Sequence, residues 1–143
     1  MSVRSWIADR WLAEYWRPLT LGERGERVAV RTLRRRGYRI AATRRRIRYG
    51  EIDVIAVDGR TIVFVEVKTR RSERLGSPAT AVDHLRRRRM TRAAVAFLKA
   101  HDLLSYPARF DVVEVVWPTD ADEPLVRHHV NAFPAEGRAE MLR

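Results

Sequence analysis

Residues 50–70, GEIDVIAVDGRTIVFVEVKTR, decide the architecture of this chain. Two apolar runs flank a tight turn at Asp58-Gly59, and this pattern predicts a β-hairpin. The second run is apolar on both faces, because valines alternate with Ile62 and Phe64. A strand of this kind is normally buried in the middle of a layered sheet. The stretch therefore predicts a hairpin whose second strand is central.

The central strand ends in charged residues. Glu66 and Lys68 are two positions apart, so they share a face of the strand. Asp53 lies in the first run of the hairpin, which can bring the three side chains together at one end of the sheet. Charges at the end of a buried strand cost free energy unless they are paired or bind an ion. We therefore expect a charged cluster of Asp53, Glu66 and Lys68.

The composition is that of one globular domain. The chain has 143 residues, of which 45% are hydrophobic and 33% charged, enough for a real core. It has no cysteine, which excludes disulfides, thiolate metal sites and cysteine catalysis. The sequence shows neither a membrane-spanning run nor a signal peptide, so we expect a cytoplasmic protein without a membrane partner.

The charge balance favours a polyanionic partner. The net charge is +11 and the pI about 11.3, which is most simply explained by nucleic acid. Only Lys68 and Lys99 among the 29 basic residues are lysine. A chain that uses arginine elsewhere keeps a compact point charge at Lys68.

The order of predicted elements is α-β-β-β-α-β, with a further strand at the end left open. This is an α/β layer architecture, a mixed central sheet flanked by helices. The predicted elements are a helix at 20–36, a strand at 38–47 (with Tyr38, Ile40 and Ala42 alternating), the hairpin, one long helix or two at 79–101, and strands at 109–117 and 126–133. We assign residues 18–133 to this domain and 134–143 to a frayed tail.

Residues 1–17 are assigned to an accessory amphipathic helix with apolar residues, several of them tryptophan, at helical spacing. It would pack on the domain or on a second copy of the chain, so a homodimer stays open. A membrane-surface helix is the alternative. Asp9 and Glu14 argue against it.

The helix at 20–36 begins with a capping box, Thr20 to Glu23, and its inward stripe is expected to hold Ala29, Val30 and Leu33. Glu26 lies four residues before Val30 and shares that stripe. It either forms a salt bridge with a neighbouring arginine of the helix, Arg27 or Arg31, or is a fourth charged group aimed at the hairpin. The glycines of this helix, at positions 22 and 25, favour the second reading because glycine suits a close approach.

Two carboxylates and a lysine suffice for phosphodiester cleavage. Mg²⁺ takes one or two carboxylates and leaves positions for water and a substrate phosphate. The metal polarises the phosphoryl oxygen, and a lysine beside it orients the attacking water or stabilises the developing charge.

The order of Asp53, Glu66 and Lys68 resembles the PD-(D/E)XK pattern of restriction-endonuclease-like nucleases, and Glu26 matches the helical acid of archaeal Holliday junction resolvases. More closely, the chain is similar to the YraN family of bacterial proteins over roughly residues 21–133. The matching pieces are Gly25-Glu26, Gly37-Tyr38, Gly50-Glu51-Ile52-Asp53, residues 63–70 (VFVEVKTR), residues 109–113 (RFDVV) and residues 129–133 (HVNAF).

The resemblance implies a restriction-endonuclease-like fold with Mg²⁺ or Mn²⁺ at Asp53 and Glu66. It implies Glu26 as a further ligand or a supporting acid, and Lys68 as the group beside the attacking water. Ile52 stands where the broader pattern often has proline.

Nine arginines are expected to hold phosphates: Arg44, Arg45, Arg46, Arg70, Arg71, Arg86, Arg87, Arg88 and Arg89. Phosphate contacts position a substrate without reading its sequence, so branched or structured DNA is favoured over a base sequence. The leading hypothesis is a metal-dependent nuclease acting on DNA. The alternatives are a nucleic-acid-binding module, in which the acids form a structural ion-pair network, and a protein-interaction scaffold.

Two lesser candidates accompany the cluster. Asp111 begins a strand. It either caps a loop, binds an arginine or takes part in the function of the protein. Glu51 is a further candidate ligand, with a salt bridge to Arg48 as its alternative. The adjacent His128 and His129 should face opposite ways on a strand, which excludes a shared metal site.

Overall fold

The structure, a computed structural model, describes residues 17–72 and 83–137. Its order, α-β-β-β-α-β-β, is the predicted one, and the last strand that the sequence left open is present. The elements are α2 (Leu21–Arg35), β1 (Arg39–Ile47), β2 (Gly50–Asp58), β3 (Thr61–Arg70), α3 (His84–Ala100), β4 (Ala108–Val116) and β5 (Leu125–Phe133).

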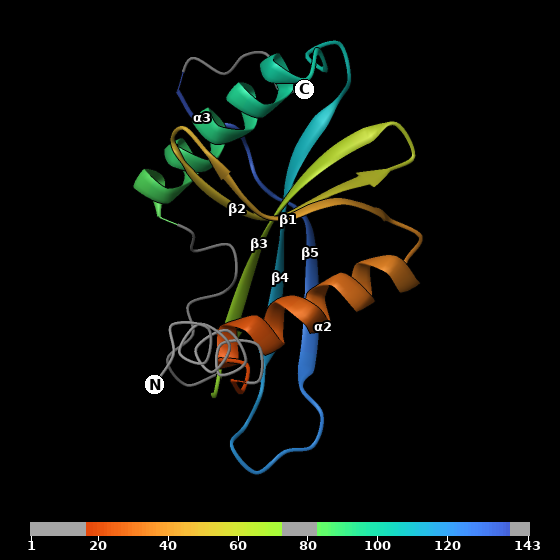
Figure 1. The fold of residues 1–143 in the computed structure, drawn as a ribbon, viewed down its shortest axis with the longest axis vertical. Helices are drawn as coiled ribbons and strands as arrows, with labels where there is room; N and C mark the ends of the chain where they lie inside the picture. Colours follow the sequence, from red (N-terminus) through yellow and green to blue (C-terminus); the bar gives the residue numbers. More distant parts are fainter. Residues whose placement is uncertain (1–16, 73–82, 138–143) are drawn as a thin grey trace, which may run out of the picture.

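The strands form one mixed sheet in the order β1-β2-β3-β4-β5 (Figure 1). Neighbouring strands are antiparallel except β3 and β4, which are parallel. A parallel pair needs a long crossover connection, and α3 lies within it. The central position predicted for β3 is confirmed.

The two helices cover opposite faces of the sheet. α2 packs against the face of β3 that carries Val63 and Val65, and α3 packs against the face that carries Ile62 and Phe64. All four side chains are buried, which confirms the prediction of a strand apolar on both faces.

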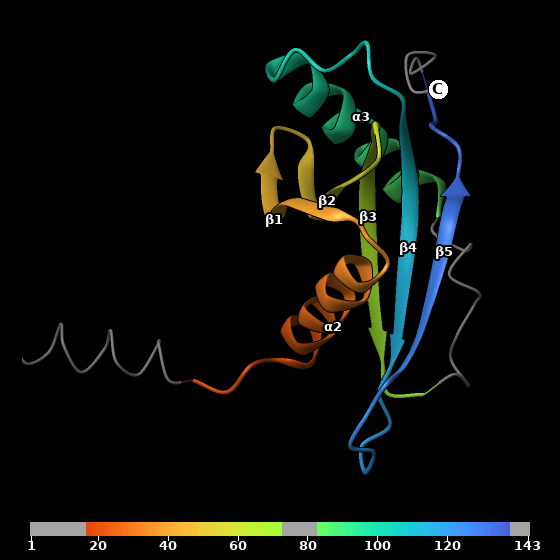
Figure 2. The same ribbon diagram turned by 90° about the vertical axis from the view of Figure 1, so that its right-hand side faces the viewer.

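The hairpin of β2 and β3 closes where the sequence predicted. Asp58 pairs with Thr61, and Gly59 occupies the turn at φ +61°, a conformation that favours glycine. The ladder runs from this turn to the pair Val54–Val65 and does not continue to the start of β2. The first residues of β2 and the end of β1 stand apart from β3 and lie beside α3 (Figure 2).

The alternation predicted for β1 needs a correction. Tyr38 and Ile40 pack on the α2 side, as expected for one face, but Ala42 packs on the α3 side. The cause is a register shift between Ile40 and Ala42 in the pairing with β2. A bulge of one residue reverses the face of everything beyond it.

The start of α2 follows the capping prediction. The Thr20 hydroxyl accepts a hydrogen bond from the backbone N–H of Glu23 at 3.2 Å. The Glu23 carboxylate accepts from the Thr20 hydroxyl at 3.1 Å instead of from the backbone.

The buried stripe of α2 agrees in part with the predicted one. It contains Ala29 and Leu33 as expected, together with Gly25 and Val28, whereas Val30 is only half-buried at its edge. At Gly25 a Cβ would meet the Thr69 side chain of β3, so the helix lies very close to that strand there.

Some expectations fall outside the described residues. These are most of the accessory helix at residues 1–17, residues 79–82 of the helix expected at 79–101, and residues 138–143 of the expected tail. Within the described part of that tail, Glu136 contacts His84 at 2.9 Å, and its backbone N–H donates to the Thr91 hydroxyl at 3.1 Å. None of the helices in the described residues is long and apolar enough to cross a membrane.

Candidate active site

Asp53 lies where β2 parts from β3. Val54 is the last residue of β2 that pairs with β3. Beyond this pair, β3 contacts β2 through the side-chain carboxylate of Asp53. Its Oδ2 accepts a hydrogen bond from the backbone N–H of Val67 at 2.9 Å. The contact fixes Asp53 at the segment of β3 that carries Glu66 and Lys68.

The surroundings of Asp53 disfavour its negative charge. Burial raises the pKa of Asp53 to about 7, and the negative charge of Glu66 adds to that rise. The hydrogen bond from Val67 opposes the rise, and the charge of Glu26 reinforces it. Asp53 and Glu66 are therefore a like-charged pair, as the hairpin geometry predicted.

Glu66 is paired with the first turn of α3. Arg86 donates from a terminal guanidinium nitrogen to Glu66 Oε2 at 2.8 Å, and both side chains are partly shielded from water. The same nitrogen lies 3.5 Å from the backbone carbonyl of Glu51. Burial alone would lower the pKa of Arg86, but the hydrogen bond to Glu66 outweighs it and raises the pKa. Arg86 thus supplies a positive charge next to the carboxylate pair.

Lys68 shares the α3 face of β3 with Glu66, and its register partner on β4 is Glu114. Burial lowers the pKa of Lys68, and the charge of Arg70 lowers it further, against the opposing charges of Glu66 and Glu114. Within residues 17–72 and 83–137, no hydrogen bond or ion pair fixes the Lys68 ammonium group. The side chain is therefore free to contact a substrate or water.

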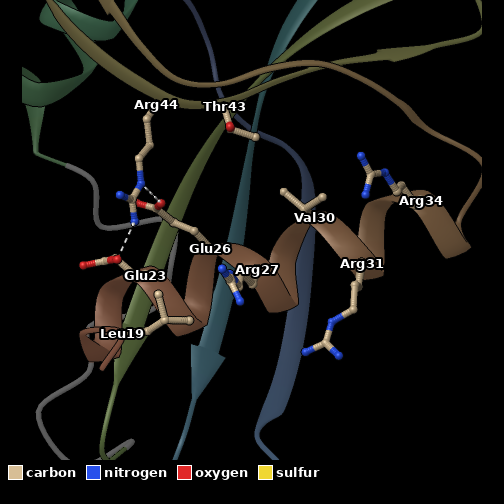
Figure 3. Close-up of a pocket in the computed structure, with 9 residues that line it drawn as sticks. All are labelled: Leu19, Glu23, Glu26, Arg27, Val30, Arg31, Arg34, Thr43 and Arg44. Carbon is tan, nitrogen blue, oxygen red and sulfur yellow. Dashed lines mark hydrogen bonds and ion pairs between the residues drawn. The ribbon is translucent and has the colours of Figure 1, made fainter. Parts of the chain in front are cut away.

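Glu26 points toward β1 and not along its own helix. Arg44 of β1 donates from Nε to the Glu26 carboxylate, as Figure 3 shows. The salt bridge with Arg27 or Arg31 that the sequence left open is not formed, and the charge of Glu26 instead raises the pKa of Asp53. Glu26 therefore pairs with an arginine of β1, a partner that neither reading named.

A close approach between α2 and β3 brings Glu26 near the cluster. A Cβ added to Gly25 would lie 1.9 Å from Oγ1 of Thr69, so only glycine fits. At Gly22 the nearest atom would be 4.0 Å away. The sequence argument for a close approach is therefore right for Gly25 and wrong for Gly22.

The nine arginines expected to hold phosphates fall into two groups. Arg45, Arg46, Arg88 and Arg89 are exposed. The other five contact protein groups: Arg44 contacts Glu26, Arg70 lies 3.9 Å from Glu114, Arg71 lies 3.5 Å from the carbonyl of Trp117, Arg86 contacts Glu66 and Arg87 lies 3.5 Å from Glu136. The run at 86–89 thus points in different directions.

A second cluster of charged and polar groups surrounds Asp111, which is fully buried. Its carboxylate accepts from Arg109 Nε at 3.0 Å, from His128 Nε2 at 2.8 Å and from the backbone N–H of Asn131 at 2.9 Å. Burial alone would raise the pKa of Asp111, but these hydrogen bonds outweigh it and lower the pKa. Asp111 holds an arginine, one of its three predicted roles.

The sequence signal for this second cluster was an acid inside an apolar strand, but the partner on β5 was not predicted. His128 faces Asp111, whereas His129 lies 3.5 Å from Glu114. The two histidines face opposite ways, as expected for neighbours on a strand.

The carboxylates of Asp53 and Glu66 are donors of the kind that a hard divalent cation takes. No group of three or more histidine, aspartate or glutamate side chains that could hold a metal ion occurs in the described parts of the chain. Two carboxylates are nevertheless what Mg²⁺ commonly takes from a protein when water and phosphate complete its octahedron. A cation would also relieve the repulsion that raises the pKa of Asp53.

Comparison with known proteins gives the family. The model of the family described as "Uncharacterised protein family UPF0102" matches residues 25–115, which include all four residues of the predicted site. The chain belongs to this family. The family expected from the sequence motifs, YraN, is thereby confirmed.

UPF0102 relatives come from distant bacteria. The UPF0102 protein of Rhodopirellula baltica is 46% identical over 138 residues, covering 94% of this chain and 83% of the relative. Those of Geotalea uraniireducens and Symbiobacterium thermophilum are 46% and 50% identical, covering 80% and 66% of this chain and 89% and 80% of theirs. The match with the Rhodopirellula protein is too long to begin at residue 21, so the similarity extends before the range we expected.

Proposed function

We propose that this UPF0102 protein is a metal-dependent nuclease that acts on DNA. The observation that carries the proposal is the pairing of Asp53 with Glu66 where β2 parts from β3, next to Lys68. Such a like-charged pair is costly in a folded protein, and metal binding is a reason to retain it. The net charge of +11 supports a polyanionic substrate.

The carboxylates of Asp53 and Glu66 would hold one Mg²⁺ or Mn²⁺ ion. When bound, the ion supplies Lewis-acid polarisation of a phosphoryl oxygen. The hydrogen bond from Val67 orients Asp53 for this role before any ion arrives.

The other residues act on the substrate or on water. The Lys68 ammonium would orient the attacking water or stabilise the charge that develops on the phosphate. Glu26, held by Arg44, would support the site as a further acid beside Asp53. Arg86 would shift between Glu66 and a substrate phosphate, because a guanidinium group binds both well.

The exposed arginines would hold the DNA backbone. Contacts to phosphate weaken steeply with salt and carry no sequence information. We therefore propose a branched or otherwise structured DNA as the substrate.

The test is cleavage of labelled linear, flapped, single-stranded and four-way-junction DNA with Mg²⁺ or Mn²⁺. We expect metal-dependent cleavage that disappears in an Asp53→Ala/Glu66→Ala variant purified in parallel. Asp58→Asn is the matched control, because Asp58 is on the same strand and is paired with an arginine at its far end. Equal cleavage by the double variant and the wild type would overturn the proposal.

A nucleic-acid-binding module without catalysis is the second candidate. The observation in its favour is that two acids of the cluster, Glu26 and Glu66, are each paired with an arginine. In that case the acids would be a structural network, and Glu66→Gln would lower thermal stability without changing any turnover. A nuclease would instead lose cleavage with Glu66→Gln and keep DNA binding.

A further inference from the structure

A groove runs between the β1–β2 turn and the outer face of α3. Arg48 and Tyr49 form one wall, and Arg88, Arg92 and Lys99 of α3 line the other. The turn lies beside α3 in both views of the fold (Figures 1 and 2). None of these residues except Arg88 belongs to the site predicted from the sequence.

The groove is strongly positive. Four of its lining side chains are cations, namely those of Arg48, Arg88, Arg92 and Lys99. Among the described lining residues the one acid is Glu136, and its charge is engaged by His84 at 2.9 Å and by Arg87 at 3.5 Å. The groove therefore favours a polyanion.

Tyr49 places an aromatic ring among these cations. Tyr49 is 42% exposed. The guanidinium carbons of Arg48 and Arg92 lie 5.5 and 6.0 Å from its ring centroid. Aromatic rings set in a basic groove are the platforms on which proteins stack unpaired bases.

The groove leads to the candidate active site. Tyr49 is separated from Glu51 by one residue, and the backbone carbonyl of Glu51 lies 3.5 Å from Arg86. Arg86 in turn contacts Glu66 and begins the helix that carries Arg88 and Arg92. A strand that follows the groove would reach the carboxylates without crossing the sheet.

We propose that this groove binds an unpaired nucleic-acid strand, with one base stacked on Tyr49, and delivers that strand to Asp53 and Glu66. This inference rests on the proposed nuclease function and names its substrate as a single strand or the unpaired arm of a branched molecule. A duplex keeps its bases stacked on one another, so it could contact the cations of the groove but not cover the ring of Tyr49.

The first test compares Tyr49→Ala with Tyr49→Phe and Tyr106→Ala. Tyr106 is the matched control, since it is 39% exposed and has Arg60 5.8 Å from its ring but does not line the groove. Binding is measured by fluorescence anisotropy in EDTA, with labelled oligothymidine and oligouridine of about 16 nucleotides and a duplex of equal length.

Loss of the ring should weaken binding to oligothymidine by about 5- to 150-fold, the range for one stacked base. Tyr49→Phe and Tyr106→Ala should bind as the wild type does, and duplex binding should not change in any variant. Equal weakening with oligouridine would extend the ligand to RNA. If Tyr49→Ala binds oligothymidine as tightly as Tyr106→Ala does, the proposal is overturned.

The second test measures how the salt dependence of binding changes when arginines of the groove are removed. Arg88→Ala/Arg92→Ala should reduce the slope of log K against log salt for oligothymidine by about 1.4, since each lost phosphate contact contributes about 0.7. Arg31→Ala/Arg34→Ala removes the same charge from the groove on α2 (Figure 3) and should leave the slope unchanged. The opposite pattern would place the strand on α2 and contradict the proposal.

These binding tests are independent of cleavage. If Tyr49→Ala loses strand binding while no metal supports cleavage, the groove stands and the nuclease proposal fails. If cleavage depends on Asp53 but Tyr49→Ala binds and cleaves as the wild type does, the groove proposal fails alone.

Discussion

Two buried acids on neighbouring regions of the same sheet behave in opposite ways. Asp111 is fully buried yet has a lowered pKa, because two side chains and a backbone N–H donate to it. Asp53 is less buried, but its pKa is raised to about 7, because burial and the charge of Glu66 outweigh the single hydrogen bond from Val67. Burial alone therefore does not decide the state of a carboxylate.

The difference separates a structural cluster from a candidate functional one. Around Asp111 both carboxylate oxygens accept hydrogen bonds, and Arg109 continues the network to Asp58 at 3.1 Å and to the hydroxyl of Tyr38 at 2.7 Å. At Asp53 the one hydrogen bond among the described residues comes from the backbone N–H of Val67, and burial and the charge of Glu66 raise its pKa. A carboxylate with a raised pKa beside another acid is a candidate for a functional role.

The largest loss of stability is expected from a substitution of Asp111. Asp111→Ala would leave Arg109 and His128 without their carboxylate and should lower the free energy of unfolding by about 3–5 kcal/mol, measured by urea denaturation. Asp58→Ala is the control, because this acid shares Arg109 but is 46% exposed in its side chain, so it should cost less than about 1 kcal/mol. Similar losses in both variants would mean that burial of the pair is not decisive.

The next largest effect on stability is expected at Gly25, where α2 approaches β3. Gly25→Ala should destabilise the protein by about 1–3 kcal/mol, because its Cβ would overlap the Thr69 side chain. Gly22→Ala has room for its Cβ and should be neutral or stabilise by up to about 1 kcal/mol, since alanine favours a helix. Thermal unfolding of both variants checks this, and an equal response would show that helix propensity alone matters.

A third prediction uses pH to sharpen the contrast. For an acid with a raised pKa in the folded state, the cost of its charge is fully present above the folded pKa and vanishes below the unfolded one. The contribution of Asp53 to stability should therefore rise as pH falls from about 7 toward 3.8. Asp111 should contribute in the opposite sense, losing its stabilisation as pH falls through its lowered pKa.

The measurement is the free energy of unfolding at pH 5.5 and pH 8, for wild type and Asp53→Asn. The difference between the two proteins should be larger at pH 8, by on the order of 1 kcal/mol or more, since one unit of pKa shift corresponds to about 1.4 kcal/mol. A difference that does not change with pH would refute the raised pKa of Asp53.

The smallest effect is expected from Arg86. Its ion pair with Glu66 is partly exposed, so Arg86→Ala should cost about 1 kcal/mol or less in the metal-free protein. Because the arginine is then no longer competing for Glu66, the stabilisation by Mn²⁺ should increase. Arg89→Ala is the control, as an exposed arginine of the same helix. No gain in Mn²⁺ response would mean that Arg86 does not compete with the ion.

Much of the fold could be predicted because it depends on local patterns. The two-faced valine strand predicted the centre of the sheet, Asp58-Gly59 predicted the turn and Thr20 predicted the start of α2. The meeting of Asp53 with Glu66 followed from the hairpin, because strand pairing brings distant residues to known positions.

The remaining features depend on tertiary contacts that spacing does not encode. A one-residue bulge after Ile40 changed the face of β1, α2 packs against Thr69 at Gly25, and Val28 is buried where Val30 was expected. The partner of Glu26, Arg44, comes from another element, as does His128 for Asp111. Tyr49 could not be recognised as a candidate binding residue from the sequence, because its neighbour Arg92 belongs to α3.

The most direct test of the account is thermal unfolding at pH 8 with increasing Mn²⁺, for wild type, Asp53→Asn and Asp58→Asn. Without metal, Asp53→Asn should unfold at a higher temperature than the wild type, because the cost of burying the Asp53 charge and its repulsion with Glu66 are both removed. Mn²⁺ should stabilise the wild type and Asp58→Asn, by about 2.7 kcal/mol at a hundredfold excess over Kd, and leave Asp53→Asn unchanged. If Asp53→Asn instead unfolds at a lower temperature and responds to Mn²⁺ as the wild type does, Asp53 is a structural acid like Asp111 and the account is wrong.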